Sequence, residues 1–582
     1  MSTREPHRRN RPLAETSRLR TAALAAIWRI EHGFEHARRA RGLANDTRLR
    51  ILAVACVLGL GFLGLAIGAV SAALWPSPAP RSTALFAAQG RGDLVDRRGS
   101  LLATDLPVYG LYYDPQLNWD PGEVRARLPA LAPGLTPARL AAAVGGDHRQ
   151  YLIGDLSPQQ KAAIDDLGLP GVSFEPEVRR VYPAGPVAGH LVGFTQRGGE
   201  GLAGAERALD RQLVGRAEGD ATPLSMDLRV QAALDSELSA AATRFSALGA
   251  VGVVTNVHTG EILALSSWPA LDPAAPGAGP RQARIDHAVT SVYEPGSIFK
   301  VFTLAMGLDA GLATIDTPFD ARAPLTIGRQ TIHDYDKDNA VLPLWKVFTH
   351  SSNIGAARLG LMVGADRMRD YLAGLGLLDA APVQLPGSAR PILPRTFTDN
   401  AVASMAFGSA ISVSPLAIAA GMDTVLNGGD YVPLTIAPRA SAPNGRRVIS
   451  AATSRTMLNL MRLNVLQGTG GKARVSGYRV GGKTGSQEKV IDGHYDRHKL
   501  VSSFAAVFPT DGALSDDRYV VLIMLDEPHA TPETFGFATG GWTAAPTAGR
   551  VIARIAPFLN VPRRPPVTFE ALPAGDGSTS PG

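Results

Sequence analysis

A run of 24 residues without a charged side chain, Ile51 to Leu74, constrains this chain more than any other feature of its sequence. At about 1.5 Å per residue, a helix of that length crosses the roughly 30 Å hydrocarbon core of a bilayer with room for tilt. Arg48 and Arg50 precede the run, and Trp75 follows it. The pattern predicts one transmembrane helix at 51–74.

The charge is concentrated ahead of this run. Residues 1–50 carry 12 arginines and five acidic residues, a net charge of +7, whereas the remaining 532 residues sum to −1. A nearly neutral body argues against nucleic acid as a partner. Basic residues flanking a span stay in the cytoplasm, so we expect a single-pass inner-membrane protein with a cytoplasmic basic tail and a periplasmic remainder. A cleaved signal peptide ending near Ser71-Ala72-Ala73 is disfavoured, because the basic region and the apolar run are both too long.

The single cysteine, Cys56, lies inside the predicted span. The exported part therefore has no disulfide and depends on buried area for its stability. Gly59 to Gly64 formally matches the G-x-G-x-x-G pattern of dinucleotide-binding proteins. We reject that interpretation, because the glycines follow no strand and open no β-α-β unit.

Composition divides the exported part into four segments. They are a Pro-rich linker at 75–87, a mixed module at 88–220, a large domain at 221–562 and a Pro-, Gly- and Ser-rich tail at 563–582. In the module, two strands joined by a turn at Arg98-Gly99 and a helix near 137–144 are predicted. The module has no dense cluster of His, Cys and acidic residues, which favours a structural or partner-binding role.

The large domain has an α+β pattern, with strands at both ends and helices between them. Strands are predicted at 249–256, 261–266, 478–482, 501–508 and 519–525. A helix is predicted at 228–243, and helical patterns dominate 298–372 and recur at 414–427, 451–466 and 544–558. This order suggests one sheet built from both ends of the domain around a helical insert.

Ser297 is a candidate nucleophile. Pro295 and Gly296 prevent helix before it, and an apolar helical pattern follows, so the serine falls in the first helical turn near the positive end of the helix dipole. Lys300 returns to nearly the same face three residues later. A desolvated lysine next to another cation loses its proton readily and serves as the base that a serine needs. Alone, this spacing is also typical of an ordinary helix start.

Ser351 and Asn353 lie at a loop or helix start after an apolar segment. The hydroxyl suits proton relay and the amide suits binding of a substrate peptide. The alternative at such a position is a helix cap.

Lys483-Thr484-Gly485-Ser486 follows the strand predicted at 478–482. A strand edge binds an extended peptide through its main chain, a glycine lets that peptide approach, and lysine with threonine binds a carboxylate. The alternative is a solvated hairpin.

The three motifs occur in the order S-x-x-K, S-x-N and K-T-G, with spacings of 54 and 132 residues. Together they resemble the penicilloyl serine transferase superfamily, which contains penicillin-binding proteins and serine β-lactamases. Arg91-Gly92, Asp96-Arg97 and Gly204-Ala205-Glu206 resemble the N-terminal module of class B penicillin-binding proteins. Two segments resemble the septal, cell-division type more than the elongation type: Glu294-Pro295-Gly296-Ser297 and Ser351-Ser352-Asn353-Ile354-Gly355. Val301, Ser486 and the loop Phe407-Gly408-Ser409-Ala410, which lacks a second glycine, depart from the family pattern.

The resemblance implies a penicillin-binding transpeptidase domain, with an antiparallel sheet, flanking helices and a helical subdomain, on an elongated pedestal module. It also implies that Lys300, beside Lys483, deprotonates Ser297 for attack on the penultimate D-Ala carbonyl of a peptidoglycan stem peptide. The N–H groups of Ser297 and Ser486 would form the oxyanion hole. Ser351 would pass the proton to the leaving D-Ala. Asn353 would hold the peptide, and Lys483 with Thr484 would bind its carboxylate, before a second stem's amine resolves the ester.

The implied ligands are D-Ala-D-Ala stem peptides and β-lactams, and the implied partners are a membrane-embedded glycosyltransferase and other division proteins. No cofactor or metal is expected; His494 and His498 have a helical spacing but lie in a loop-like segment. The alternatives are an elongation-type transpeptidase, a β-lactamase and a non-enzymatic scaffold that senses β-lactams. A membrane anchor and a large module disfavour the β-lactamase, and an intact motif set disfavours the scaffold.

Overall fold

The computed structural model describes residues 28–29, 43–74, 90–216, 219–335 and 339–565, and divides the chain into two units, 1–82 and 83–582. In the first unit, helix α2 (Leu43–Leu74) contains the whole charge-free run, with side chains described for residues 51–66. Among the described residues, no helix has both the length and the apolar character that a membrane crossing requires. The predicted linker at 75–87, and most of the tails at 1–50 and 563–582, lie outside the described residues.

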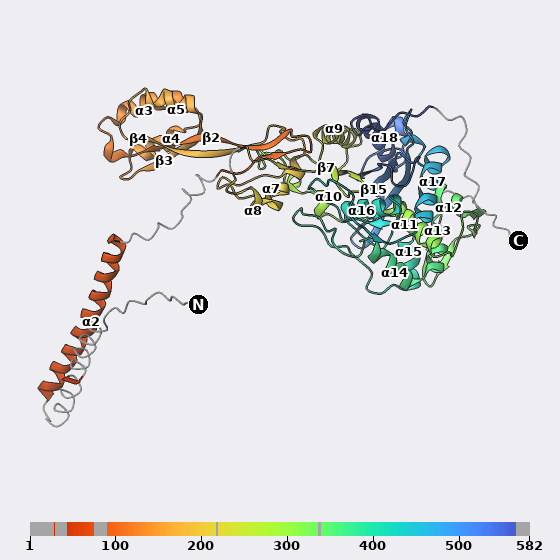
Figure 1. Ribbon diagram of the computed structural model, residues 1–582, viewed down its shortest axis with the longest axis horizontal. Coiled ribbons are helices and arrows are strands. Elements are labelled where there is room, and N and C mark those ends of the chain that lie inside the picture. The colour runs from red at the N-terminus through yellow and green to blue at the C-terminus, as the bar shows by residue number, and fades with distance from the viewer. Residues whose placement is uncertain (1–27, 30–42, 75–89, 217–218, 336–338, 566–582) are drawn as a thin grey trace, which may run out of the picture. The chain divides into compact units, whose positions relative to one another are not determined.

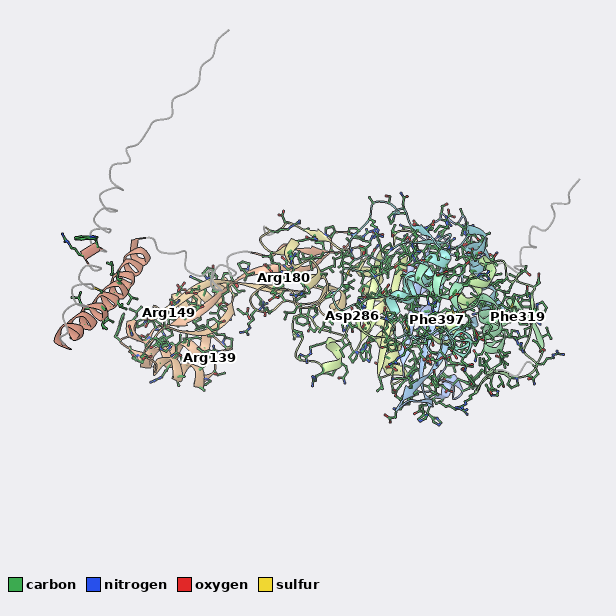
Figure 2. All side chains as sticks on the ribbon, turned by 90° about the horizontal axis from the view of Figure 1, so that it is seen from below. Arg139, Arg149, Arg180, Asp286, Phe319 and Phe397 are labelled. Atoms are coloured by element: carbon green, nitrogen blue, oxygen red, sulfur yellow. The ribbon has the colours of Figure 1, made fainter. Side chains whose placement is uncertain are left out.

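The N-terminal module of the second unit has a five-stranded sheet with a small lobe of helices (Figure 1). Strand β2 (Leu101–Tyr113) pairs antiparallel with β3 (Gln150–Leu156) and β4 (Val172–Val181), and the short strands β1 (Leu94–Val95) and β5 (Thr222–Pro223) complete the sheet. Helices α3 (Pro121–Leu131), α4 (Pro137–Val144) and α5 (Pro158–Asp165) each begin with a proline after a side-chain cap. The helix predicted at 137–144 is confirmed. Arg139 and Arg149 in Figure 2 belong to this lobe.

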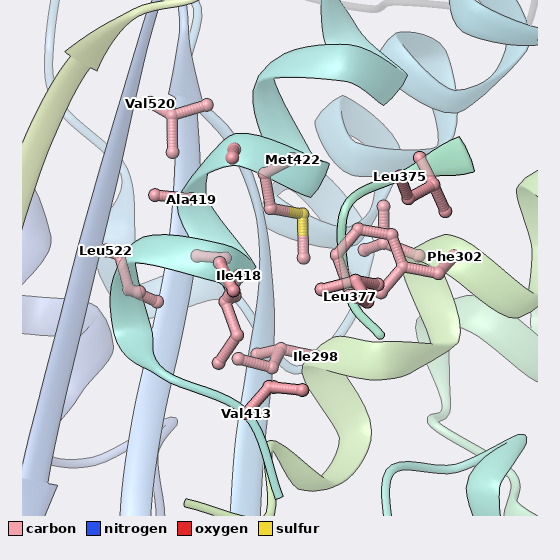
Figure 3. Close-up of a cluster of buried hydrophobic side chains, with 14 of the residues drawn as sticks. Ile298, Phe302, Leu375, Leu377, Val413, Ile418, Ala419, Met422, Val520 and Leu522 are labelled. Atoms are coloured by element: carbon pink, nitrogen blue, oxygen red, sulfur yellow. The ribbon is translucent and has the colours of Figure 1, made fainter. Parts of the chain in front are cut away.

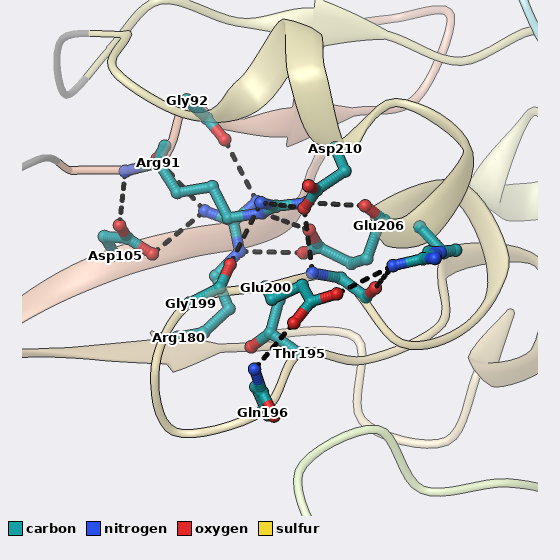
Figure 4. A network of polar contacts seen from close by, with 12 residues as sticks. Arg91, Gly92, Asp105, Arg180, Thr195, Gln196, Gly199, Glu200, Glu206 and Asp210 are labelled. Carbon is teal, nitrogen blue, oxygen red and sulfur yellow. Dashed lines mark hydrogen bonds and ion pairs between the residues drawn. The ribbon is translucent and has the colours of Figure 1, made fainter. Parts of the chain in front are cut away.

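A buried ion-pair network ties the module together (Figure 4). The fully buried Glu206 carboxylate accepts from Arg91 Nε at 2.6 Å and from Arg180 Nε at 2.8 Å. Arg91 also binds Asp210 at 2.8 Å, and Arg180 binds Asp105 at 3.0 Å. These residues come from the segment before β1, from β2 and β4, and from the short helices α7 (Gly204–Ala208) and α8 (Asp210–Leu213). Both arginines of this network are therefore paired with carboxylates, as burial of charge requires.

The large domain contains an antiparallel five-stranded sheet in the order β14-β15-β16-β6-β7. Its strands are β6 (Gly249–Asn256), β7 (Ile262–Trp268), β14 (Gly481–Ile491), β15 (His494–Phe508) and β16 (Tyr519–Asp526). Pairing of β16 with β6 joins the two ends of the domain, which confirms the single sheet predicted from sequence. Helices α9 (Leu228–Arg244) and α18 (Ala544–Ile555) pack with the sheet in one apolar core.

The helical insert packs on the sheet through a second apolar core (Figure 3). Ile298 is fully buried, and it lies close to Val413 and to Ile418 of helix α16 (Pro415–Leu426). The residue next to the candidate nucleophile is therefore part of the core. The other helices of the insert are α10 (His287–Thr290), α11 (Lys300–Asp309), α12 (Leu344–Thr349), α13 (Asn353–Val363), α14 (Ala365–Gly374), α15 (Asp399–Met405) and α17 (Ala451–Gln467).

Short elements complete the N-terminal module and the large domain. They are α6 (Gly189–Val192), η1 (Pro115–Leu117), η2 (Arg281–Arg284), η3 (Gly296–Phe299), η4 (Gly471–Ala473), η5 (Pro532–Thr534), β8 (Pro318–Asp320), β9 (Leu325–Ile327), β10 (Gln330–Ile332), β11 (Val341–Pro343), β12 (Asp430–Tyr431) and β13 (Arg446–Arg447).

Two local predictions were wrong. The strand predicted at 478–482 begins only at Gly481, so Lys483-Thr484-Gly485 lies within β14 instead of after it. His494 and His498 belong to β15 and not to a loop. Both errors have the same cause: β14 and β15 pair from Gly481 opposite Val507 out to Ile491 opposite His494, and this pairing overrides the turn-forming composition.

Substitution of Glu206 by alanine should lower the free energy of unfolding by about 3–5 kcal/mol, because it leaves two buried guanidinium groups without their shared carboxylate. Thermal and denaturant unfolding of the detergent-solubilised chain measures this. Glu200→Ala is the matched control, since Glu200 is half exposed and pairs with Arg207 at 2.9 Å. Equal stability of the two variants would contradict a stabilising role for the network.

Candidate active site

Ser297 lies in η3, a tight turn that runs directly into α11 at Lys300. Gly296 before it has φ +55°, and its N–H donates to the Gly408 carbonyl at 3.0 Å. A Cβ on Gly408 would lie 2.0 Å from the Gly296 carbonyl oxygen, so only glycine fits there. In the loop 407–410, Ala410 stands in place of the second glycine of the family pattern. Ala410 has φ +59°, and its N–H donates to the Glu294 carboxylate at 2.9 Å. The hydrogen bond helps hold this unfavourable backbone conformation.

The Lys300 amine lies at the centre of the site and is fully buried. Its Nζ is 3.0 Å from Ser297 Oγ, as the spacing of three residues predicts. It also lies 2.5 Å from the Ser351 carbonyl oxygen, 3.1 Å from Ser351 Oγ and 2.7 Å from Asn353 Oδ1. The structure thus brings the first two predicted motifs into direct contact.

Lys483 completes the group from β14. Its Nζ, also fully buried, is 2.9 Å from Ser351 Oγ and 3.1 Å from the Thr484 carbonyl oxygen. The Ser351 hydroxyl therefore lies between two lysine amines. Burial lowers the pKa of Lys483 to about 7. Burial, with the nearby charge of Lys483, holds the pKa of Lys300 well below its ordinary value, so a neutral amine is available near Ser297.

Glycine and hydroxyl groups place β14 against the nucleophile turn. A Cβ on Gly485 would lie 2.9 Å from the Pro295 carbonyl oxygen and 2.3 Å from Ser503 Oγ. Gly485 therefore lets the strand pack on the turn of Ser297, a role that we did not predict from the sequence. Thr484 Oγ1 bonds to Thr469 Oγ1 at 2.7 Å, and the exposed Ser486 accepts from the Gly540 N–H at 2.9 Å. Strand β14 is at an edge of the sheet, as peptide binding requires.

Sequence reasoning missed three polar residues around the site. Asp334 binds the turn of Ser352 and Asn353. Glu294 was noted only for its resemblance; its carboxylate accepts from Gln487 Nε2 at 2.8 Å and from Tyr495 Oη at 3.2 Å, and burial raises its pKa. The hydrogen bond between Thr469 and Thr484 was also not predicted. The position of Glu294 in a segment that resembles the family was the available signal, whereas Asp334 lies in a loop without one.

The arrangement is suited to acyl transfer. It holds a serine hydroxyl in contact with a desolvated amine, and a second hydroxyl placed to move a proton. In the described part of the chain, no group of three or more His, Cys, Asp or Glu side chains is arranged to hold a metal ion.

Comparisons with known proteins match both modules. The family model of the penicillin-binding protein transpeptidase domain matches residues 250–552, and that of the penicillin-binding protein dimerisation domain matches residues 87–221. The probable peptidoglycan D,D-transpeptidase FtsI of Caulobacter vibrioides is 52% identical over 548 residues, 92% of this chain and 93% of that protein. FtsI of Escherichia coli K12, a peptidoglycan D,D-transpeptidase, is 30% identical over 81% of this chain and 84% of its own. The crystal structure of penicillin-binding protein 3 from Mycobacterium tuberculosis with aztreonam superposes with a TM-score of 0.63 and 25% identity, covering 83% of this chain and 99% of that one.

Replacement of Lys483 by methionine should reduce the dependence of stability on pH. With a folded pKa of about 7 against an ordinary 10.5, the unfolded chain binds more protons than the folded chain between these values, so the free energy of unfolding of the wild type rises with pH from 7 to 9. The methionine variant lacks that contribution. Melting temperatures at pH 6.5, 8 and 9 measure the difference. The control is Lys499→Met, because Lys499 is partly exposed and its Nζ lies 3.8 Å from a Glu527 carboxylate oxygen. Parallel pH profiles for all three proteins would contradict a neutral buried Lys483.

Proposed function

The chain belongs to the class B penicillin-binding proteins, and on that premise we propose that it is a peptidoglycan D,D-transpeptidase that cross-links stem peptides during septal wall synthesis through an acyl-enzyme at Ser297. The observation that carries the proposal is the contact of Ser297 Oγ with the fully buried Lys300 amine at 3.0 Å. A buried amine with a lowered pKa accepts the serine proton near neutral pH.

In the proposed reaction, Lys300 takes the proton of Ser297 as the serine oxygen attacks the penultimate D-Ala carbonyl. The backbone N–H groups of Ser297 and Ser486 stabilise the oxyanion. The proton returns through Ser351, 3.1 Å from Lys300, to the amine of the leaving D-Ala as the C–N bond breaks. The amine of a second stem peptide then attacks the serine ester, which forms the cross-link and frees Ser297.

Substrate binding is assigned to the edge of β14 and to Asn353. Lys483 and Thr484 would bind the terminal carboxylate, with Gly485 keeping the strand close to the nucleophile. The Oδ1 of Asn353 accepts from Lys300 and its Nδ2 donates to the His333 carbonyl, so a substrate carbonyl would take the second Nδ2 hydrogen.

We assign β-lactams as covalent inhibitors of the same serine, in line with the aztreonam complex recorded for the Mycobacterium tuberculosis protein. The septal role rests on the relatives named FtsI. A β-lactamase needs a free base that activates water for deacylation. The two carboxylates described above, Glu294 and Asp334, are each engaged by several donors, which disfavours that alternative.

Covalent capture of fluorescent penicillin tests the assignment. We expect stable labelling of the full chain, labelling at background for Ser297→Ala, and normal labelling for the control Ser291→Ala, whose hydroxyl contacts His287. Release of the label within seconds would indicate a β-lactamase instead. A folded wild-type chain that takes no label would indicate a scaffold without transpeptidase activity.

We further propose a single-pass anchor at 51–74 in the inner membrane, with residues 1–50 cytoplasmic and the catalytic domain periplasmic. The 24 uncharged residues and the arginine-rich tail support this topology. The proposed partners are a membrane-embedded glycosyltransferase, which would supply the glycan strands, and other division proteins. No nucleic acid is involved.

Two arginines in the middle of the run should abolish membrane retention. Leu60→Arg with Leu63→Arg adds roughly 2.5–3.5 kcal/mol of insertion cost per residue, whereas alanine at the same two positions keeps the run apolar. Membrane fractionation with alkaline extraction compares the two double variants. A wild-type chain extracted as readily as the arginine variant would contradict the anchor.

A further inference from the structure

Asp334 lies in the loop between β10 and β11, where its carboxylate binds the start of α13. Its Oδ1 accepts from the Asn353 N–H at 2.5 Å and from the Ile354 N–H at 2.9 Å. Its Oδ2 accepts from the Ser352 hydroxyl at 2.7 Å, and that hydroxyl accepts in turn from the Gly355 N–H at 2.9 Å. The carboxylate and the cap together bind the first three N–H groups of an 11-residue helix.

The turn held in this way carries most of the contacts of the Lys300 amine. Ser351 has φ +61°, a left-handed conformation that is unfavourable for a non-glycine residue. In that conformation its carbonyl and hydroxyl oxygens both bond to Lys300 Nζ, and the adjacent Asn353 contributes Oδ1. Three of the four atoms that contact the Lys300 amine therefore lie on this strained turn. Asp334 binds the same turn through other groups, the Ser352 hydroxyl and the N–H groups of Asn353 and Ile354.

We propose that Asp334 is a positioning residue for the acylation of Ser297: its carboxylate fixes the turn that places Ser351 and Asn353 on the Lys300 amine. The inference rests on the proposed function and deepens it. Asp334 touches none of the reacting atoms, so it acts through Lys300 and Ser351. A displacement of about 1 Å in such a site costs on the order of 10²-fold in rate.

The charge of Asp334 has a second, separable effect. Two charged groups face the Lys300 amine among the described residues: Lys483 from β14, which lowers the pKa of Lys300, and Asp334, which raises it. The neighbours from η3 and α13, Ser297 and Asn353, are uncharged. Removal of the negative charge should therefore lower the pKa of Lys300 further, and so move the acid limb of the acylation profile to lower pH.

Two substitutions separate geometry from charge. Asparagine at 334 keeps one oxygen for the two backbone N–H groups and places an amide hydrogen toward Ser352 Oγ, so it preserves the turn without the charge. Alanine removes all three contacts. Asp120→Ala is the matched control, because Asp120 caps α3 through the N–H groups of Gly122 and Glu123 at 3.0 and 3.1 Å in the N-terminal module.

The experiment measures the rate constant of acylation of the full chain by fluorescent penicillin between pH 5 and 9, together with melting temperatures. We expect Asp334→Ala to slow acylation on the order of 10²-fold at every pH. Asp334→Asn should approach the wild-type plateau with its acid limb at lower pH, and Asp120→Ala should leave the profile unchanged. The asparagine variant retains the turn and keeps the test valid if the alanine variant unfolds.

Three results would overturn the inference: an Asp334→Ala chain that acylates at the wild-type rate, an Asp120→Ala chain that is equally slow, or an Asp334→Asn chain that loses as much rate as alanine without a shift of the acid limb. In each case the proposed function stands as long as the wild type is labelled and Ser297→Ala is not. A wild type without label removes both.

Discussion

Burial of two lysine amines around one hydroxyl is the constraint on which the rest of the structure depends. Lys300 and Lys483 are both excluded from solvent, and both contact Ser351 Oγ, at 3.1 and 2.9 Å. Removing an ammonium group from water costs several kcal/mol, and a second like charge nearby adds to that cost. At least one amine is therefore driven toward its neutral form near pH 7. The fold supplies the energy for this arrangement, and the neutral amine is what makes a serine reactive.

The core holds the arrangement in place from three directions. Ile298 and Phe299, next to the nucleophile, are fully buried and anchor the turn before α11. The close approach of β14 at Gly485 brings Lys483 within reach, and Gly408 supports the turn from the opposite loop. Cores packed at native density do not deform continuously, so the packing around both lysines resists displacement of their side chains. The apolar contacts of Ile298, Phe299 and the core around them therefore offset the free-energy cost of burying the two amines.

The sequence predicted those parts of the site that depend on local periodicity, and missed those that depend on pairing between distant segments. The contact of Ser297 with Lys300 follows from a single helical turn, and the shared sheet follows from the order of the strands. The extents of β14 and β15 are set by their pairing with each other. The start of β14 and the inclusion of His494 and His498 in β15 therefore depend on this pairing, which neither segment encodes alone. Asp334 is 19 residues from Asn353 and belongs to no recognisable motif, so only the tertiary structure shows their contact. The packing role of Gly485 also depends on distant segments, since the atoms that exclude a side chain there come from Pro295 and Ser503.

Two buried charge clusters in this protein illustrate the difference between a cluster that stabilises the fold and one that supports a reaction. In the N-terminal module, each guanidinium of Arg91 and Arg180 has a carboxylate partner, and Glu206 shares its two oxygens between them. Every cation in this cluster therefore has a carboxylate partner, and the cluster needs no reactive group. In the large domain, two lysine amines lie together, and Asp334, the carboxylate that faces Lys300, is occupied by three donors of its own. That cluster is unbalanced, and it does not stabilise the fold, because burial of a lysine without a carboxylate partner is destabilising. The imbalance therefore marks the second cluster as the chemical site, on physical grounds that do not depend on the family comparison.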